Sequence, residues 1–374
     1  MIVADVRVRI LGAAVEDDIA MSFGALPRRS MALVEIETED GLVGRGESWI
    51  NFPPWAGHER RATIEEGVAP LLVGEDARDI GALHARMVGA LGPLGRQWGA
   101  PGPMMQAISG ADLALWDLAG TAAGVPVAEL LGGRVRERVP VYASGVGPTG
   151  VAELVERCAR RGFGAVKLRL GFGRELDEAN VRAAREAGPG IELLADANQA
   201  WTLEEALAIA PVLRECAVRW VEEPVVGDDP AELAAFHRRT GLAVATGENL
   251  YGRAAFEPYL ARPEIAVLQP DVSKAGGLTE ALAVCRRAGT AGRAVAPHLY
   301  GGAVAYAATL QLAASSPAVR IVEYDVRANP LRDGLMIDPP RVVDGHVTIP
   351  AGPGLGVTLD AAALEDLSSR GAPA

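Results

Sequence analysis

Apolar and polar positions show two different periodicities along this chain of 374 residues. In the first third, residues 1–10 and 31–38 alternate with a period of two, as half-buried strands do. Glu39-Asp40-Gly41 is a turn sequence and residues 44–47 begin another strand, so a hairpin is predicted here. Apolar residues then recur at helical spacing over 58–72, 76–90 and 103–124. The first third is therefore predicted to be an α+β unit, a strand meander followed by helices.

From Val139 onward, short apolar runs alternate with amphipathic stretches. Strands are predicted at 139–143, 164–170, 191–196, 218–222, 243–248, 265–269, 293–297 and 320–323. Helices such as 151–161, 175–187, 203–214, 229–239 and 277–288 separate them. Eight strands of this kind favour a closed parallel barrel with right-handed crossovers, an α/β fold of the TIM type. An open doubly wound sheet is the alternative, but it requires a glycine-rich fingerprint that Ser144-Gly-Val-Gly147 matches poorly.

The change of pattern divides the chain into three regions. Residues 1–125 form the α+β unit, residues 126–325 form the barrel, and residues 326–374 leave the barrel pattern. A helix is predicted at 361–369, packing back on the first region. Loops flank the early strands, and the one from Asn51 to Trp55 carries aromatic residues, which occur in binding loops and in surface packing alike.

Composition excludes several classes of function. Apolar residues make up 49% of the chain, enough for a sizeable core, and the net charge of −12 argues against nucleic-acid or membrane-surface binding. Three scattered cysteines fit a reducing cytoplasm with inert thiols better than a disulfide framework or a zinc site. The N-terminal residues alternate like a strand and show no secretory h-region. The most apolar stretch, 294–314, contains Pro297, His298 and two glycines, so no membrane span is expected.

Three acidic residues recur at equal steps of 26 residues, at Asp196, Glu222 and Glu248, and each ends a predicted strand. A βα unit of a parallel barrel takes about 30 residues, and catalytic groups lie at the carboxyl ends of its strands. The spacing therefore places three carboxylates side by side on one rim. Like charges this close repel unless a cation lies among them, and oxygen ligands suit Mg²⁺. A metal-dependent barrel enzyme is predicted, with one Mg²⁺ per subunit.

Two cations precede the acids on the strand Val166-Lys-Leu-Arg-Leu170, where Lys167 and Arg169 share one face. They either form a structural layer of ion pairs or neutralise a substrate carboxylate. Further along, Asp271 and His298 end successive strands 27 residues apart. A carboxylate beside a histidine fixes its tautomer and raises its pKa, which makes a general base. Glu323 ends the last strand, where it either hydrogen-bonds a reacting oxygen or is structural.

The order of these motifs resembles the enolase superfamily, and the Asp–His pair resembles its mandelate racemase subgroup. The resemblance rests on the following residues: Lys167-x-Arg169, Asp196-x-Asn198, Glu222-Glu223-Pro224, Gly247-Glu248, Gln269-Pro270-Asp271, Pro297-His298, the stretch Ala111 to Ala119, Leu131-Gly132-Gly133 and Pro353 to Gly356. It covers nearly the whole chain. It implies a modified barrel, (β/α)7β, with an N-terminal capping domain that the C-terminal segment completes. Loops 13–30 and 49–59 would then set specificity.

The resemblance also implies roles for single residues. Asp196, Glu222 and Glu248 match the ligands of Mg²⁺, His298 with Asp271 matches a base, and Lys167 and Glu323 match groups beside the substrate carboxylate. Asn198, Tyr300 and Trp55 are the predicted substrate contacts. The partner is expected to be a small carboxylate, an acid sugar or its lactone, and the protein a homo-oligomer, a dimer or an octamer, in the cytoplasm.

Arg169 departs from the family pattern, which has a second lysine there as the base for the opposite face. Arginine stays charged and accepts protons poorly, so racemisation with two bases is disfavoured. The leading prediction is a hydro-lyase: His298 abstracts the proton α to the carboxylate, giving an enediolate that the metal stabilises, and an acid sugar is dehydrated to a 2-keto-3-deoxy acid.

Three alternatives stay open beside this prediction. An isomerase of the same family, either a lactone cycloisomerase or a racemase or epimerase, is the first. A non-catalytic relative that binds sugar acids is the second. A phosphate-binding barrel, suggested by Gly301-Gly302, is the weakest, because His298 already occupies that strand end.

Overall fold

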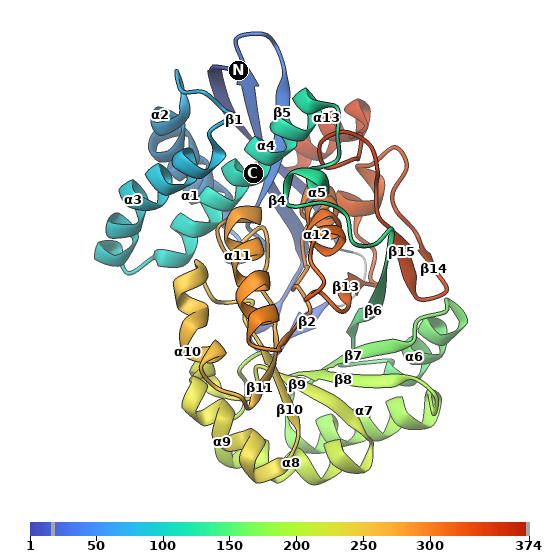
Figure 1. Ribbon diagram of the computed structural model, residues 1–374. Coiled ribbons are helices and arrows are strands. Elements are labelled where there is room, and N and C mark those ends of the chain that lie inside the picture. The colour runs from blue at the N-terminus through green and yellow to red at the C-terminus, as the bar shows by residue number, and fades with distance from the viewer. Residues whose placement is uncertain (16–18, 372–374) are drawn as a thin grey trace.

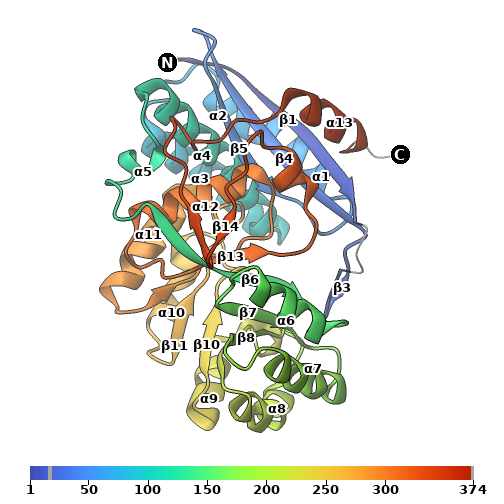
Figure 2. The same cartoon turned by 90° about the vertical axis from the view of Figure 1, so that its right-hand side faces the viewer.

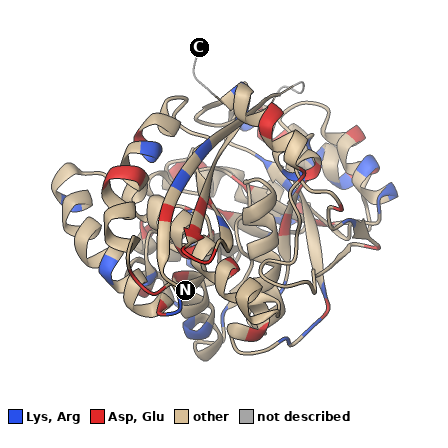
Figure 3. Ribbon diagram, turned by 90° about the horizontal axis from the view of Figure 1, so that it is seen from above, with Lys and Arg blue, Asp and Glu red and all other residues tan. Residues whose placement is uncertain are grey.

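The structure is a computed structural model that describes residues 1–15 and 19–371. The blue and cyan N-terminal elements lie above a barrel whose green to orange strands and helices fill the lower part (Figure 1). Part of the predicted loop 13–30, residues 16–18, lies outside the described residues. Acidic and basic residues are interspersed over the helices and strands of the upper face (Figure 3). Within the described part of the chain, no helix is long and apolar enough to cross a membrane.

The N-terminal unit is an antiparallel sheet of order β1-β4-β5, covered by helices. Its strands are β1 (Val3–Ala14), β4 (Arg28–Thr38) and β5 (Val43–Trp49), and a short hairpin, β2 (Ala20–Met21) and β3 (Gly24–Ala25), lies inside the region predicted to be loop. The helical elements are α1 (Ala56–Ala62), η1 (Thr63–Val68), α2 (Ala69–Leu72), α3 (Ile80–Trp98) and α4 (Pro101–Ala123). Apolar residues of the sheet and these helices form a core of their own.

Helix α4 lies close on β5 because small residues meet there. A Cβ atom at Gly46 would come within 1.8 Å of the Gly110 carbonyl oxygen, so only glycine permits this approach. The contact matters for the site, because the C-terminal end of β5 then points toward the barrel.

The barrel consists of eight parallel strands. They are β6 (Arg138–Val146), β7 (Ala165–Arg169), β8 (Glu192–Asp196), β9 (Val218–Glu222), β10 (Ala243–Thr246), β11 (Ile265–Leu268), β12 (Ala294–Val295) and β13 (Val322–Asp325). Strands β6 to β12 pair in sequence order, and β13 pairs with β6. A parallel bridge between Val295 and Val319 closes the ring, because it joins β12 to the chain just before β13. The closed barrel predicted from the pattern is confirmed.

Helices connect and cover the strands. They are α5 (Val127–Leu130), α6 (Val151–Arg160), α7 (Arg174–Ala187), α8 (Leu203–Glu215), η2 (Val226–Asp228), α9 (Pro230–Thr240), η3 (Arg253–Phe256), α10 (Glu257–Leu260), α11 (Gly277–Thr290) and α12 (Ala303–Ser315). Apolar side chains between strands and helices form the larger core. The three cysteines are free and buried.

The C-terminal segment returns to the N-terminal unit. It contains η4 (Pro330–Gly334), β14 (Val342–Val343), β15 (His346–Thr348) and α13 (Ala361–Gly371). Strand β15 pairs antiparallel with the start of β6, and α13 lies beside β1 (Figure 2). Arg9 of β1 contacts Glu365 of α13 at 2.6 Å. The segment therefore completes the cap.

Candidate active site

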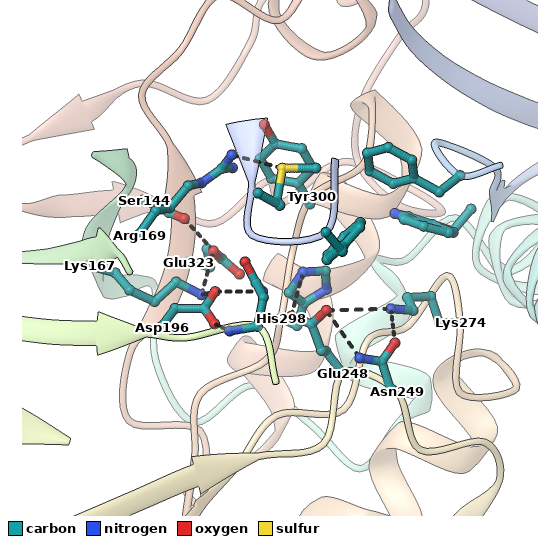
Figure 4. A pocket seen from close by; sticks show the side chains of 15 residues that line it. Ser144, Lys167, Arg169, Asp196, Glu248, Asn249, Lys274, His298, Tyr300 and Glu323 are labelled. Atoms are coloured by element: carbon teal, nitrogen blue, oxygen red, sulfur yellow. Dashed lines mark hydrogen bonds and ion pairs between the residues drawn. The ribbon is translucent and has the colours of Figure 1, made fainter. Parts of the chain in front are cut away.

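A cavity of about 240 Å³ lies between the barrel rim and the cap. Its walls are fifteen side chains, drawn in Figure 4. The polar ones come from the strand ends and loops of the barrel: Ser144, Lys167, Arg169, Asp196, Asn198, Glu248, Asn249, Lys274, His298, Tyr300 and Glu323. The apolar and aromatic ones come from the cap: Met21, Phe23, Trp49 and Phe52. A polar floor under an apolar cover is the usual form of a small-molecule site.

Strand register brings the three equally spaced acids together. Arg169 is level with Asp196, and Asp196 is level with Glu222 on the next strand. One carboxylate oxygen from each of Asp196, Glu222 and Glu248 lies within 4.8 Å of the others. The first two are buried, and burial together with neighbouring carboxylates raises the pKa of Glu222 well above its usual range. The group is oxygen-only, acidic and crowded, which fits a hard divalent cation such as Mg²⁺.

Three hydrogen bonds orient two of these acids. The amide and the side-chain NH₂ of Asn198 donate to Asp196 at 2.9 and 3.1 Å. The side-chain NH₂ of Gln269 donates to Glu222 at 2.6 Å. Partners of this kind fix ligand carboxylates in metal sites. Asn198 has a positive φ of 44°, which aims its side chain back at Asp196.

Lys167 lies at the centre of the negative charge. Its Nζ contacts Glu222 at 2.8 Å, Glu323 at 3.0 Å and Asp196 at 3.5 Å. Burial opposes the charge, but these carboxylates outweigh it and raise the pKa of Lys167 well above its usual value. These carboxylates therefore favour the charged form of Lys167.

His298 and Asp271 form a pair with the geometry of an oriented base. The Nδ1 of His298 lies 2.6 Å from Asp271, whose other oxygen accepts hydrogen bonds from the amide and hydroxyl of Ser273, both at 2.6 Å. The Nε2 of His298 lies 3.2 Å from Glu248. Burial lowers the pKa of His298, but the negative charges of Glu248 and Asp271 outweigh the effect of burial and raise this pKa to about 9.

Arg169 faces the cap. Its guanidinium donates to the Ala20 carbonyl oxygen at 3.0 Å, contacts the Met21 sulfur at 2.9 Å and lies 5.1 Å from the centre of the Tyr300 ring. Burial lowers its pKa, but Tyr300 and Asp325 outweigh it and raise that pKa above the usual value. The part of the cavity wall contributed by β7 therefore holds a fixed positive charge.

Glu323 links Lys167 to the base-bearing loop. It accepts hydrogen bonds from the Ser144 hydroxyl at 2.5 Å and from the Leu299 amide at 2.9 Å, in addition to its contact with Lys167. Burial raises its pKa, but Lys167 and His298 outweigh it and lower the pKa to about 2.

Comparison with known proteins agrees with this geometry. Residues 4–132 match the N-terminal domain of the mandelate racemase / muconate lactonizing enzyme family, and residues 150–363 match the enolase C-terminal domain-like family. This chain belongs to the mandelate racemase family of the enolase superfamily. The predicted family is therefore confirmed.

Three relatives show the breadth of this family. D-galactarolactone cycloisomerase of Agrobacterium fabrum is 35% identical over 98% of both chains. D-galactonate dehydratase of Ralstonia nicotianae is 33% identical over 93% of both chains. The crystal structure of a mandelate racemase/muconate lactonizing enzyme from Bordetella bronchiseptica superposes with a TM-score of 0.89 at 37% identity, covering 98% of this chain and 99% of that one. Lyases and isomerases thus share this fold and chain length, and this member is an enzyme of the same type.

Most residues predicted for the site of this family member come together. Lys167, Arg169, Asp196, Asn198, Glu248, His298, Tyr300 and Glu323 line the cavity, and Glu222 and Asp271 lie directly behind it, bonded to Lys167 and His298. Trp55 does not line the cavity: its side chain is 68% exposed. Trp49 and Phe52, from the same predicted loop 49–59, line it instead.

One charged residue of the cavity was missed from the sequence. Lys274 is buried, and its Nζ lies 3.1 Å from the Asn249 side-chain oxygen, 3.8 Å from Glu248 and 4.8 Å from the centre of the Trp49 ring. It follows Asp271 by three residues, so it lies beyond the strand end. The feature of the sequence that could have indicated Lys274 was its position three residues after Asp271, a carboxylate on the rim of the barrel.

Proposed function

We propose that this protein removes the proton α to the carboxylate of an acid sugar and then eliminates the 3-hydroxyl, giving a 2-keto-3-deoxy acid. The observation that carries the proposal is the asymmetry of the cavity. His298, after strand β12, is oriented by Asp271 at 2.6 Å, whereas Arg169, on strand β7, is a guanidinium that accepts protons poorly. One base serves an elimination, whereas racemisation needs a proton acceptor on each face of the α-carbon.

Asp196, Glu222 and Glu248 would hold the Mg²⁺, since their oxygens lie within 4.8 Å of one another. When bound, the ion supplies Lewis-acid stabilisation of negative charge on the substrate carboxylate. Lys167, beside Glu222 and Glu323, adds a fixed positive charge at the same place. A charge that grows in the transition state gains most from groups that are already in place.

His298 takes part in two proton transfers. Its Nε2 takes the α-proton, and the C–H electron pair moves into an enediolate. The C3–O bond then breaks, and the imidazolium returns its proton to the leaving hydroxide, which departs as water. The resulting enol tautomerises to the 2-keto acid. Asp271 supports the imidazolium during the interval between the two proton transfers.

Ring opening of a sugar lactone is the second candidate, favoured by the similarity to D-galactarolactone cycloisomerase over 98% of both chains. It begins with the same proton transfer to His298. The bond from the β-carbon to the ring oxygen then breaks, and its electron pair leaves on that oxygen, which becomes a carboxylate of the same molecule. The imidazolium of His298 returns its proton to the product, so the mass is unchanged. The apolar cover formed by Phe23, Trp49 and Phe52 suits a compact ring.

A substrate screen separates the two candidates. Mono- and diacid sugars and their lactones are incubated with the protein and Mg²⁺, and products are read by a carbonyl assay, mass spectrometry and NMR. A 2-keto product lighter by one water supports dehydration, and a 2-keto product of unchanged mass supports ring opening. Epimerised substrate without a keto product would contradict both. The matched control is the same incubation with a chelator in place of Mg²⁺.

We also propose that the protein is a cytoplasmic homo-oligomer, a dimer or an octamer. The proposal rests on the family resemblance. Light scattering on the purified protein tests the oligomeric state, and a monomeric mass would contradict the proposed oligomer.

A further inference from the structure

The segment from His298 to Gly302 joins β12 to α12 without regular secondary structure. It carries the base, His298, and it contributes Tyr300 to the cavity. Buried backbone amides and carbonyls need hydrogen-bond partners, and a segment outside helix and sheet must find them on other elements. The partners therefore show what holds the base in place.

Four side chains from different parts of the chain form hydrogen bonds with the backbone of this segment. The Leu299 amide donates to Glu323 at 2.9 Å. The Asn51 side chain donates to the Tyr300 carbonyl oxygen at 2.9 Å, and the Asn329 side chain donates to the Gly301 carbonyl oxygen at 2.9 Å. The Gly302 amide donates to Glu47 at 2.6 Å. Two of these partners, Glu47 and Asn51, belong to the cap, so the cap fixes the path of the base-bearing segment.

Glu47 makes the shortest of these contacts. Its carboxylate also accepts a hydrogen bond from the Ala305 amide at 2.8 Å, so it caps the first turn of α12. Its side chain is 1% exposed, and burial raises the pKa of its carboxyl to about 7, although the hydrogen bonds from the Ala305 and Gly302 amides favour the ionised form. A Cβ atom at Gly301 would lie 2.7 Å from one oxygen of Glu47, and one at Gly302 would lie 3.2 Å from the other. Glycine at both positions lets the carboxylate approach the backbone. The carboxylate accepts the hydrogen bonds of backbone amides that a phosphate-binding loop would donate to a phosphate.

The same strand of the cap also reaches the segment that carries Asp271. The Trp49 amide, two residues after Glu47, donates to the Ser273 carbonyl oxygen at 3.3 Å, and the Trp49 ring faces Lys274. Ser273 in turn hydrogen-bonds Asp271. Strand β5 therefore contacts both loops whose side chains form the His298–Asp271 pair.

We infer that Glu47, assisted by Asn51, is a positioning residue that holds His298 against Asp271 and so couples the cap to the base. The inference rests on the proposed role of His298 as the base. Glu47 touches neither the cavity nor the three acids; it bonds the backbone at Gly302 and Ala305, and its charge also acts on Asp271.

Glu47→Gln tests the inference. An amide has the same shape but keeps only one accepting oxygen, so its NH₂ group faces one of the two N–H donors. We expect faster hydrogen exchange in the peptide that covers 299–305, and a shifted NMR signal for the His298 ring proton bonded to Asp271. We also expect kcat to fall by about 10- to 100-fold, as for other residues that orient catalytic groups, with KM and Mg²⁺ affinity nearly unchanged.

Glu35→Gln is the matched control, because Glu35 is a buried carboxylate on the neighbouring strand β4 that pairs with Arg9 and Arg45. It should leave every readout at the wild-type value. Exchange and NMR signals of Glu47→Gln identical to those of Glu35→Gln would overturn the inference. Changed signals with unchanged kcat would support the positioning of His298 and count against His298 as the base.

Asn51→Asp is a second variant in case Glu47→Gln does not fold. It keeps the acceptor for the Ser30 amide and loses the donor to the Tyr300 carbonyl oxygen. The same exchange and NMR changes are expected, and their absence would overturn the inference as well.

Discussion

Asp271→Asn tests how the base is oriented. The Asp271 carboxylate accepts a hydrogen bond from His298 Nδ1 on one oxygen and two from Ser273 on the other, all at 2.6 Å. An ionised carboxylate only accepts, so one ring proton is held on Nδ1, and the proton that His298 gains or loses is the one on Nε2, which faces Glu248.

An asparagine cannot serve both partners. If its oxygen keeps the Ser273 amide, its NH₂ group donates to Nδ1, the ring proton moves to Nε2 and the base is lost. If its oxygen keeps Nδ1–H, its NH₂ group faces the Ser273 amide, although the Ser273 hydroxyl can turn to accept. This orientation loses a charged hydrogen bond, about 1.5–3 kcal/mol, and leaves a buried donor unpaired, about 1–3 kcal/mol. The sum of about 2.5–6 kcal/mol corresponds to a roughly 10²- to 10⁴-fold fall in kcat.

The assay is kcat on the substrate found in the screen, with α-proton exchange in D₂O as an independent readout. Calorimetry should give unchanged Mg²⁺ affinity, because Asp271 is not among the three acids that lie within 4.8 Å of one another. Asp117→Asn is the control: Asp117 accepts two backbone hydrogen bonds at 2.8 Å in the cap, and its substitution lowers stability without lowering kcat. An unchanged kcat for Asp271→Asn would refute the orientation argument.

Three further predictions concern the metal and the opposite face. Glu222→Gln should weaken Mg²⁺ binding by at least about tenfold, because affinity follows ligand charge; equal calorimetric affinities would remove Glu222 from the ligand set. A chelator should lower the melting temperature and excess Mg²⁺ should restore it, since a ligand that binds the folded state stabilises it; a melting temperature indifferent to both would argue against the site. Arg169→Lys should loosen the Ala20–Met21 hairpin and admit α-proton exchange from the second face, followed by NMR in D₂O. No exchange from that face would show that a lysine there lacks access to the α-carbon.

The barrel and its rim were predictable because both follow from spacing. Parallel strands in sequence order put residues one βα unit apart beside each other, so steps of 26 residues from Asp196 to Glu248 were enough to predict the cluster of acids. The same reasoning placed His298 beside Asp271, and the register of the strands agrees.

The cap over the cavity was not predictable in this way. Which aromatic residue of the loop 49–59 faces the substrate depends on how the cap docks on the barrel, and no periodicity in the chain reports that angle. Trp55 points to solvent, while Trp49, at the end of β5, reaches Lys274. Arg169 shows the same limit: its place on β7 was predicted, but its contact with the Ala20 carbonyl oxygen depends on the hairpin that lies above it.

The proposed mechanism requires that His298 alone removes the α-proton. The most direct test compares the wild type with His298→Asn in D₂O with Mg²⁺ and follows the α-proton of the substrate by NMR. The account predicts stereospecific exchange from one face in the wild type. In the variant it predicts neither exchange nor product, while Mg²⁺ affinity is retained. Exchange in His298→Asn, or exchange from both faces in the wild type, would contradict the account.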